Sequence, residues 1–215
     1  MDADPYLSNG FLSILSLILY IPWADLGNLI ALVLFLLASG LFSGSEIAMF
    51  SLSHEDLDDI KEQGTPASKA LVFLKTHTKR LLALILICNT FVNIAIALIV
   101  ERLLASWLPP EKYTHWSEAI IQWLSIQTYT VEEIGQMIYF LIAVVGATTL
   151  ILFFGEVMPK IYGRLNTKSL ALTMAVPLRV LDFIFTPMTY LMVSMTHRVE
   201  KRLLEKKVGI QSTSR

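Results

Sequence analysis

The sequence predicts an all-α membrane protein with three transmembrane helices and a broken juxtamembrane helix. Of its 215 residues, 54% are hydrophobic and only 16% are charged, whereas soluble domains average about 25% charged residues. Three apolar stretches reach the roughly 20 residues that a helix needs to cross a bilayer. The net charge of −1 provides no electrostatic attraction for nucleic acid. The single cysteine, Cys88, rules out a disulfide framework and a multi-cysteine zinc site.

The predicted spans cover residues about 26–50, 81–100 and 137–158. Glu46 is the one charged residue of the first span, the second span has none, and the third reaches its first charge at Glu156. Residues 1–24 contain a shorter apolar stretch that ends in Pro-Trp. We expect this N-terminal segment to lie at the membrane interface rather than to cross the bilayer.

A fourth apolar stretch, residues 168–195, is long enough to span but is interrupted. It contains Arg179 and Asp182, and a charge at the bilayer centre costs about 2.5–3.5 kcal/mol. Pro177 and Pro187 each remove a backbone donor that lipid cannot replace. We therefore predict a broken juxtamembrane helix along the membrane surface, with a fourth span as the alternative. The transmembrane domain as a whole covers residues 25–195.

The distribution of basic residues predicts the orientation. Five Lys and Arg residues separate the first two spans, two separate the second from the third, and ten follow the third. The 54–80 loop and the C-terminus are therefore predicted to be cytoplasmic, and the N-terminus and the 101–136 loop extracytoplasmic.

In the cytoplasmic loop, Ser53 and Thr65 are predicted to cap two short helices separated by Gly64.

Polar residues inside the predicted spans form three groups. Ser39 and Ser43 are four residues apart and so share one helix face, as do two asparagines of the second span, Asn89 and Asn93. The third group is the Gly-Glu-x-x-Pro run that begins at Gly155. Lipid makes each of these groups costly, which favours a functional reason for them.

The third group adds a backbone oxygen to these side chains. Pro159 has no N–H, so the carbonyl of Gly155 loses its helical hydrogen-bond donor. Together with the carboxylate of Glu156, the hydroxyls and the amides, this carbonyl makes an all-oxygen set. Hard cations such as Mg²⁺ prefer oxygen ligands, whereas zinc and copper favour sulfur and imidazole.

Helix packing explains the same residues without an ion. The two serines alternate with Gly40 and Gly44 in a small-xxx-small pattern that allows close helix approach. The two asparagines could hydrogen-bond a neighbouring helix, and Glu156 could pair with Lys160 one turn later. At the level of sequence both interpretations remain open.

Enzymatic machinery is not visible in the sequence. Ser43 lies in a G-x-x-S-G run rather than the G-x-S-x-G of a nucleophile elbow. No histidine falls within a predicted span, and no Walker-type glycine loop occurs. We therefore expect a non-enzymatic protein without catalytic or cofactor-binding residues.

Three motifs, in this order, resemble the transmembrane domain of the CorC/cyclin M (CNNM) family of magnesium transporters. They are LFSGSEIAMFSLS at residues 41–53, LICNTFVNIA at 86–95 and FGEVMPKIYG at 154–163. The resemblance implies three spans plus a juxtamembrane helix in a homodimer of the bacterial inner membrane. It also implies that a dehydrated Mg²⁺ binds between the helices and is exported against sodium entry.

The resemblance assigns the metal ligands to Ser39, Ser43, an asparagine of the second span (Asn89 or Asn93), Glu156 and a backbone carbonyl near Gly155. It implies that residues 196–215 begin a cytosolic acidic helical bundle, truncated here. Nucleotide would bind only through CBS domains absent from this chain.

A second hypothesis uses the same helices differently. Within the family, the sequence resembles a bacterial subgroup linked to gliding motility in Bacteroidetes. On this hypothesis the protein is a non-transporting membrane anchor or scaffold, associated with motility or secretion, and its small residues serve dimerisation. A channel is a third possibility, which predicts ion flux without dependence on sodium.

Overall fold

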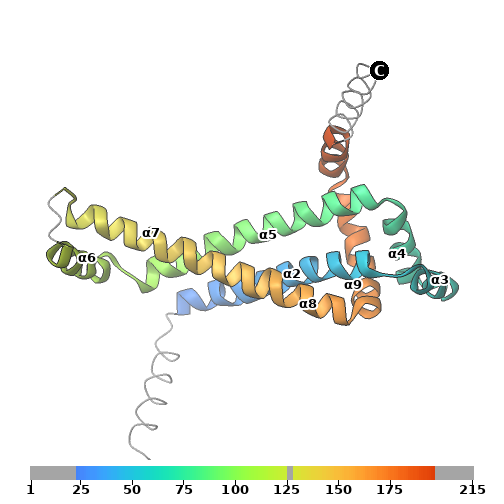
Figure 1. Cartoon of the computed structure of the whole chain (residues 1–215), viewed down its shortest axis with the longest axis horizontal. Coiled ribbons are helices and arrows are strands. Elements are labelled where there is room, and N and C mark those ends of the chain that lie inside the picture. The colour runs from blue at the N-terminus through green and yellow to red at the C-terminus, as the bar shows by residue number, and fades with distance from the viewer. Residues whose placement is uncertain (1–22, 125–127, 197–215) are drawn as a thin grey trace, which may run out of the picture. The chain divides into compact units, whose positions relative to one another are not determined.

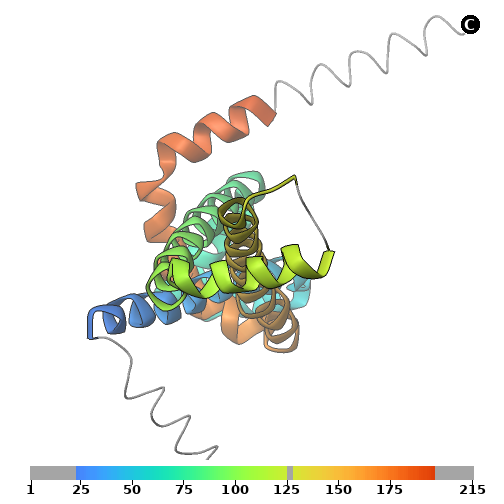
Figure 2. The ribbon, with the colours of Figure 1, turned by 90° about the vertical axis from the view of Figure 1, so that its left-hand side faces the viewer.

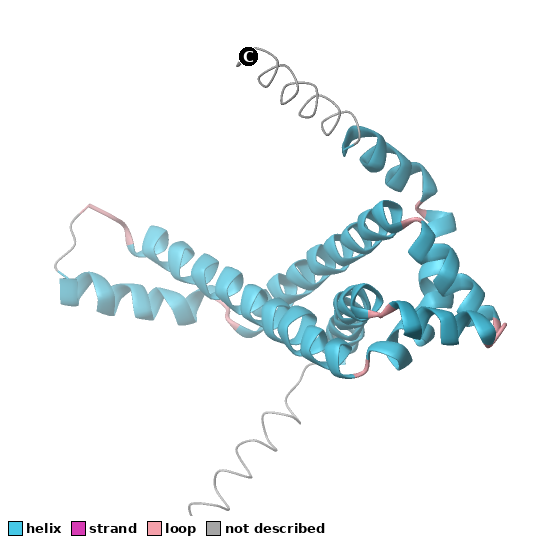
Figure 3. Ribbon diagram, turned by 45° about the vertical axis from the view of Figure 1, so that its right-hand side comes forward, coloured by secondary structure: helices cyan, strands magenta, loops and turns pink. Residues whose placement is uncertain are grey.

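The computed structural model describes residues 23–124 and 128–196, and its regular structure in these ranges is entirely helical (Figure 1). Short loops connect the helices (Figure 2, Figure 3). In chain order they are α2 (Trp23–Ser51), α3 (His54–Glu62), α4 (Pro66–Thr76), α5 (Thr78–Trp107), α6 (Pro110–Leu124), α7 (Val131–Leu150), η1 (Ile151–Val157), α8 (Met158–Leu165), α9 (Thr167–Ile184) and a last segment, Thr186–Thr196.

Three helical stretches are long and apolar enough to cross a membrane, as predicted: Asp25–Ser51, Thr78–Trp107 and Val131–Leu165. Each extends beyond its predicted apolar core because the helix continues into polar flanking residues. The predicted broken helix is also confirmed, since α9 and Thr186–Thr196 meet at an angle of 84°. The expected interfacial segment before residue 23 and the expected bundle beyond residue 196 lie outside the described residues.

The chain divides into two compact units, and each is described separately. One combines residues 1–35 with 95–149, and the other combines 36–94 with 150–215. All six candidate ligands fall in the second unit. Its core is formed by apolar side chains of α2, α3, α4, α5 and α9 that are wholly buried, among them Met49, Ile60, Leu71, Leu84 and Leu178.

The short helices begin where the sequence predicts. The Ser53 hydroxyl accepts a hydrogen bond from the backbone N–H of Asp56, whose carboxylate in turn accepts from the backbone N–H of Ser53. This reciprocal capping box starts α3, and the hydrogen bond from the Ser53 hydroxyl, reinforced by its backbone N–H, holds the pKa of Asp56 below its usual value. Thr65 caps α4 through its hydroxyl, which accepts from the backbone N–H of Ser68, and between the two helices Gly64 adopts φ of 63°. Only a residue without a Cβ adopts that backbone conformation at little cost.

A buried carboxylate, that of Asp182, joins α9 to α5. It also accounts for the two charged residues that made the fourth apolar stretch unfavourable as a span. Asp182 is 1% exposed, and its two carboxylate oxygens accept from Arg80 Nε at 2.5 Å and Arg179 Nη1 at 2.8 Å. Arg80 Nη2 also reaches the backbone oxygen of Asp182 and the hydroxyl of Thr186, at 3.2 and 2.8 Å. The guanidinium of Arg179 lies over the ring of Phe73. The pair of charges is therefore satisfied inside the protein, at the bend itself.

We predict that Arg80→Ala lowers the free energy of unfolding by about 3 kcal/mol, because it leaves a buried carboxylate short of its strongest partner. This is the low end of the range for buried pairs, since Arg80 is 32% exposed and Arg179 remains. The matched control is Lys61→Ala, which breaks an exposed pair with Asp58 and should cost less than about 1 kcal/mol. Denaturant unfolding in detergent measures both, and equal losses would contradict the buried role of Asp182.

Candidate cation site between the spans

A wholly buried serine in the middle of α2 contacts both asparagines of α5. The hydroxyl of Ser39, 0% exposed, lies 3.0 Å from Asn89 Oδ1 and 2.8 Å from Asn93 Oδ1. The asparagines lie one helical turn apart, so their side chains point to the same side of α5. The structure therefore brings the oxygen of Ser39 together with two amide oxygens that lie 50 and 54 residues later in the sequence.

In this cluster one hydroxyl proton lies between two amide oxygens. The hydroxyl of Ser39 carries one hydrogen, which satisfies one amide oxygen fully, whereas two amide oxygens lie within hydrogen-bonding distance. The second amide oxygen therefore lies against the Ser39 oxygen without a hydrogen from this hydroxyl between them. A cation among these oxygens would remove that repulsion, which makes the cluster chemically suited to a hard metal ion.

Ser43, one turn further along α2, adds an unsatisfied oxygen. Its side chain is 1% exposed, and within the described residues its Oγ is the one buried side-chain polar atom without a hydrogen-bond partner. Leaving such a group unpaired costs about 1–3 kcal/mol. Nearby Ser45, equally buried, instead donates to the backbone oxygen of Phe42 at 2.8 Å. The orphaned hydroxyl is therefore specific to Ser43.

The third motif adopts a π-helix, η1, rather than the α-helix that the sequence predicts. The N–H of Met158 donates to the backbone oxygen of Phe153, five residues earlier. In the π-helical register, the backbone N–H of residue 159 would donate to the backbone oxygen of Phe154, and in the α-helical register to that of Gly155. Because Pro159 has no N–H, it can donate to neither oxygen. π-Helical turns are rare and frequently occur at functional sites.

Glycines bring η1 and α8 directly against α2. A Cβ on Gly155 would lie 2.7 Å from Ser39 Oγ, and one on Gly40 would lie 2.9 Å from Pro159 Cγ. One on Gly44 would lie 2.9 Å from the backbone oxygen of Pro159, and one on Gly163 would collide with the backbone oxygen of Gly44. The close packing that the sequence allowed for Gly40 and Gly44 is thus confirmed. It places η1 beside the serine that contacts the asparagines.

The sequence interpretation did not include Gly163, and it did not foresee that Pro159 contacts α2. Helical spacing could have identified Gly163, since it follows Gly155 by eight residues and therefore lies near the same helix face. Their partner on α2 could not be known from spacing along one helix.

The remaining candidate, Glu156, follows Gly155 in η1 and is half-buried. Within the described residues its carboxylate makes no hydrogen bond or ion pair, so the pairing with Lys160 that the sequence permits does not occur. The structure thus brings Ser39, Asn89, Asn93 and Gly155 into contact, while Ser43 and Glu156 form no hydrogen bond with this group.

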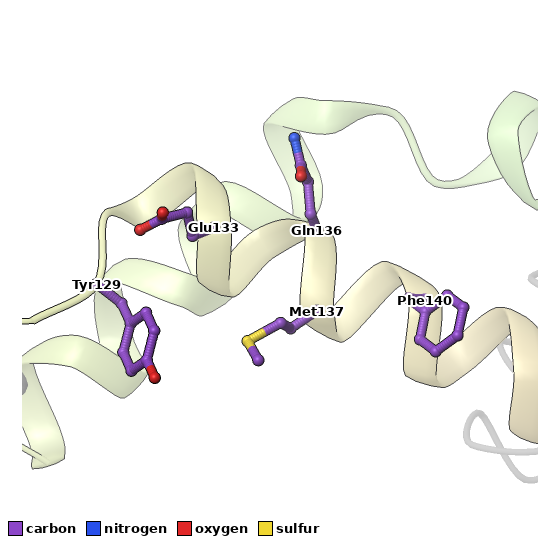
Figure 4. A pocket seen from close by; sticks show the side chains of 5 residues that line it. All are labelled: Tyr129, Glu133, Gln136, Met137 and Phe140. Carbon is purple, nitrogen blue, oxygen red and sulfur yellow. The ribbon is translucent and has the colours of Figure 1, made fainter.

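A pocket of about 380 Å³ elsewhere in the chain contains none of the six candidates. Side chains from the start of α7 and the turn before it line the pocket: Tyr129, Glu133, Gln136, Met137 and Phe140 (Figure 4). The carboxylate of Glu133 accepts from the backbone N–H and hydroxyl of Thr130, at 2.8 and 3.1 Å, and so caps α7. The one acidic side chain of this pocket, Glu133, therefore stabilises the start of α7.

We predict that Gly155→Ala destabilises the fold by about 1–3 kcal/mol, because the new methyl group would overlap Ser39 Oγ. The matched control is Gly146→Ala in α7, where a Cβ meets nothing within 4 Å and alanine is the better helix former. Thermal unfolding of the purified protein distinguishes the two. Ser39→Ala should partly rescue Gly155→Ala, since it removes the nearest clash, and a lack of rescue would contradict the contact.

Comparison with known proteins identifies relatives of the chain. A family model described as the cyclin M transmembrane N-terminal domain matches residues 29–214. The UPF0053 protein sll1254 of Synechocystis sp. is 26% identical over 167 residues, which make up 78% of this chain and 40% of that protein. The chain thus spans about two-fifths of the length of this curated relative. On the family-model match, the chain belongs to the cyclin M (CNNM) transmembrane domain family.

Proposed function

We propose that this chain is the transmembrane domain of a Mg²⁺ transporter, residues 25–195, and that Mg²⁺ passes between α2, α5 and η1 as a dehydrated ion. The observation that carries the proposal is the oxygen cluster at Ser39, with two amide oxygens around one hydroxyl. Membership in the cyclin M family, which the sequence motifs link to magnesium transport, supports the choice of ion.

The spacing of the cluster fits the size of Mg²⁺. In an octahedral site with ligands at about 2.0–2.1 Å, neighbouring oxygens lie about 2.9 Å apart. The hydroxyl of Ser39 lies 3.0 and 2.8 Å from the two amide oxygens. The oxygens around the Ser39 proton could therefore become adjacent ligands with little movement. A preformed arrangement of this kind lowers the reorganisation needed to replace the water shell of the ion.

Ser43 and Glu156 would complete the ligand set. The unpaired hydroxyl of Ser43 needs a partner, and the carboxylate of Glu156 makes no competing bond with any residue that the structure describes. A backbone carbonyl freed by Pro159, that of Gly155 in the α-helical register or of Phe154 in the π-helical one, would supply a further oxygen. One carboxylate against a divalent ion leaves a net positive charge, which favours release of the cargo over permanent retention.

The location of the cluster suits transport. Ser39 lies near the middle of α2, and the two asparagines lie near the middle of α5. An ion there would lie between helices at mid-membrane depth, from which either membrane face can be reached. We propose sodium as the coupling ion, a cytoplasmic C-terminus, and a homodimer in the bacterial inner membrane, as the motifs and the basic residues imply.

We predict that Ser43→Ala and Glu156→Gln each weaken Mg²⁺ binding about tenfold or more, the equivalent of roughly 1.4 kcal/mol for each lost ligand. The matched control is Ser45→Ala, which removes an equally buried hydroxyl of α2 that is already bonded to the backbone oxygen of Phe42. Isothermal titration calorimetry of the purified protein with MgCl₂ measures all three. If both variants bind as the native protein does, these residues are not ligands.

The close glycine packing of α2 on η1 and α8 favours the second candidate, a membrane anchor without transport. Flux measurements on proteoliposomes loaded with Mg²⁺ distinguish the functions. A sodium-coupled transporter should release Mg²⁺ only when sodium is supplied on the opposite side, and Ser43→Ala should slow release. Flux independent of sodium would indicate a channel, and no flux in the native protein would favour the anchor.

A further inference from the structure

We infer that α6, between the second and third spans, lies in the interfacial layer of the bilayer and inserts Trp116 and Trp123 among the lipid head groups. These two tryptophans of α6 are 46% and 81% exposed. Neither the family match nor the proposed ion site assigns a task to this helix. The inference is independent of whether the protein transports an ion.

The two tryptophans share one side of α6. Trp123 follows Trp116 by seven positions, a rotation about 20° short of two full helical turns. Glu118 follows Trp116 by about 200° around the helix axis, and the exposed Gln122 precedes Trp123 by about 100°. The aromatic side and the polar side of α6 are therefore different surfaces, as expected for a helix at a boundary between water and lipid.

A third side of α6 is occupied by protein. Ser117 is 0% exposed, and a Cβ on Gly135 of α7 would lie 3.1 Å from its hydroxyl and 2.8 Å from the ring of Tyr113. The rings of Tyr113 and Tyr139 also meet, with centroids 5.7 Å apart. This contact fixes α6 alongside the first turns of α7 (Figure 1, Figure 3). Its tryptophans are left on a side that α7 does not cover.

Chain connectivity fixes the depth of α6. The 30 residues of α5 are about 45 Å long, which matches a bilayer of 40–45 Å including its head-group layers. Only two residues separate Trp107, the end of α5, from Pro110, the start of α6, so the two ends are at most about 10 Å apart. On the other side, Gly135 lies two residues before the apolar stretch of the third span. Both attachments place α6 at the membrane boundary.

The lipid-facing surface of the spans continues onto this helix. Trp107 is 45% exposed at the end of α5, and Met137 and Phe140 are 62% and 68% exposed on α7 beside the contact with α6. Tryptophan is enriched at membrane interfaces because its ring is apolar while its N–H remains hydrogen-bonded. A bilayer surface is therefore the occupant that fits the tryptophan side of α6.

The test uses proteins that carry a tryptophan at one position of α6. In the first, Trp23→Phe, Trp107→Phe and Trp116→Phe leave Trp123; in the matched control, Trp123→Phe is added and Gln122→Trp moves the probe to the polar side. Both are reconstituted in phosphatidylcholine vesicles with bromine near the carboxyl end of the acyl chains. We expect Trp123 to lose its emission to the lipid bromines and to resist aqueous iodide, and the probe at position 122 to show the reverse.

Two outcomes would overturn the inference. Quenching of Trp123 by iodide but not by bromolipid means that this side faces water. Protection from both quenchers means that protein, such as a second copy of the chain, covers it. Because Trp107 donates a hydrogen bond to Asp25, the pair is repeated with Trp107 retained, and the difference between positions 123 and 122 must persist.

Discussion

The close approach of α2 to η1 and α8 is the constraint on which the second unit depends. Four glycines make it possible, because at each one a Cβ would lie within 3 Å of the facing helix. Without a hydrophobic driving force between helices in lipid, such backbone proximity is what dispersion forces require to hold spans together. The same approach places the backbone of Gly155 against Ser39. Packing and polar chemistry therefore meet at Ser39.

Polar groups in this contact are left incompletely satisfied. One hydroxyl serves two amide oxygens, and a second hydroxyl, that of Ser43, has no partner among the described residues. Native proteins rarely retain buried polar atoms in this state without a reason. The π-helical turn beside them adds backbone carbonyls that a proline cannot serve. The shared proton of Ser39 and the unpaired hydroxyl of Ser43 are the physical basis for the proposed Mg²⁺ site.

The buried charges of α9, in contrast, have hydrogen-bond partners. Asp182 is as deeply buried as the serines, yet both its oxygens and its backbone carbonyl have guanidinium donors. It therefore lies fully paired beside the 84° bend between α9 and the last described segment. In one unit of the chain, a fully paired charge thus serves architecture and an underpaired oxygen cluster remains for chemistry.

The sequence by itself determined the features that depend on one segment and its solvent. Lipid requires about 20 apolar residues per span, so the three spans were predictable, and Ser53 and Thr65 cap helices through bonds to residues three positions away. Spacing also showed that Asn89 and Asn93 share a face. Only the tertiary structure decided that this face meets Ser39, that Arg80 pairs with a carboxylate 102 residues later, and that the third motif widens into a π-helix. Helical periodicity fixes which residues point together, but the partner across a contact depends on how separate helices pack.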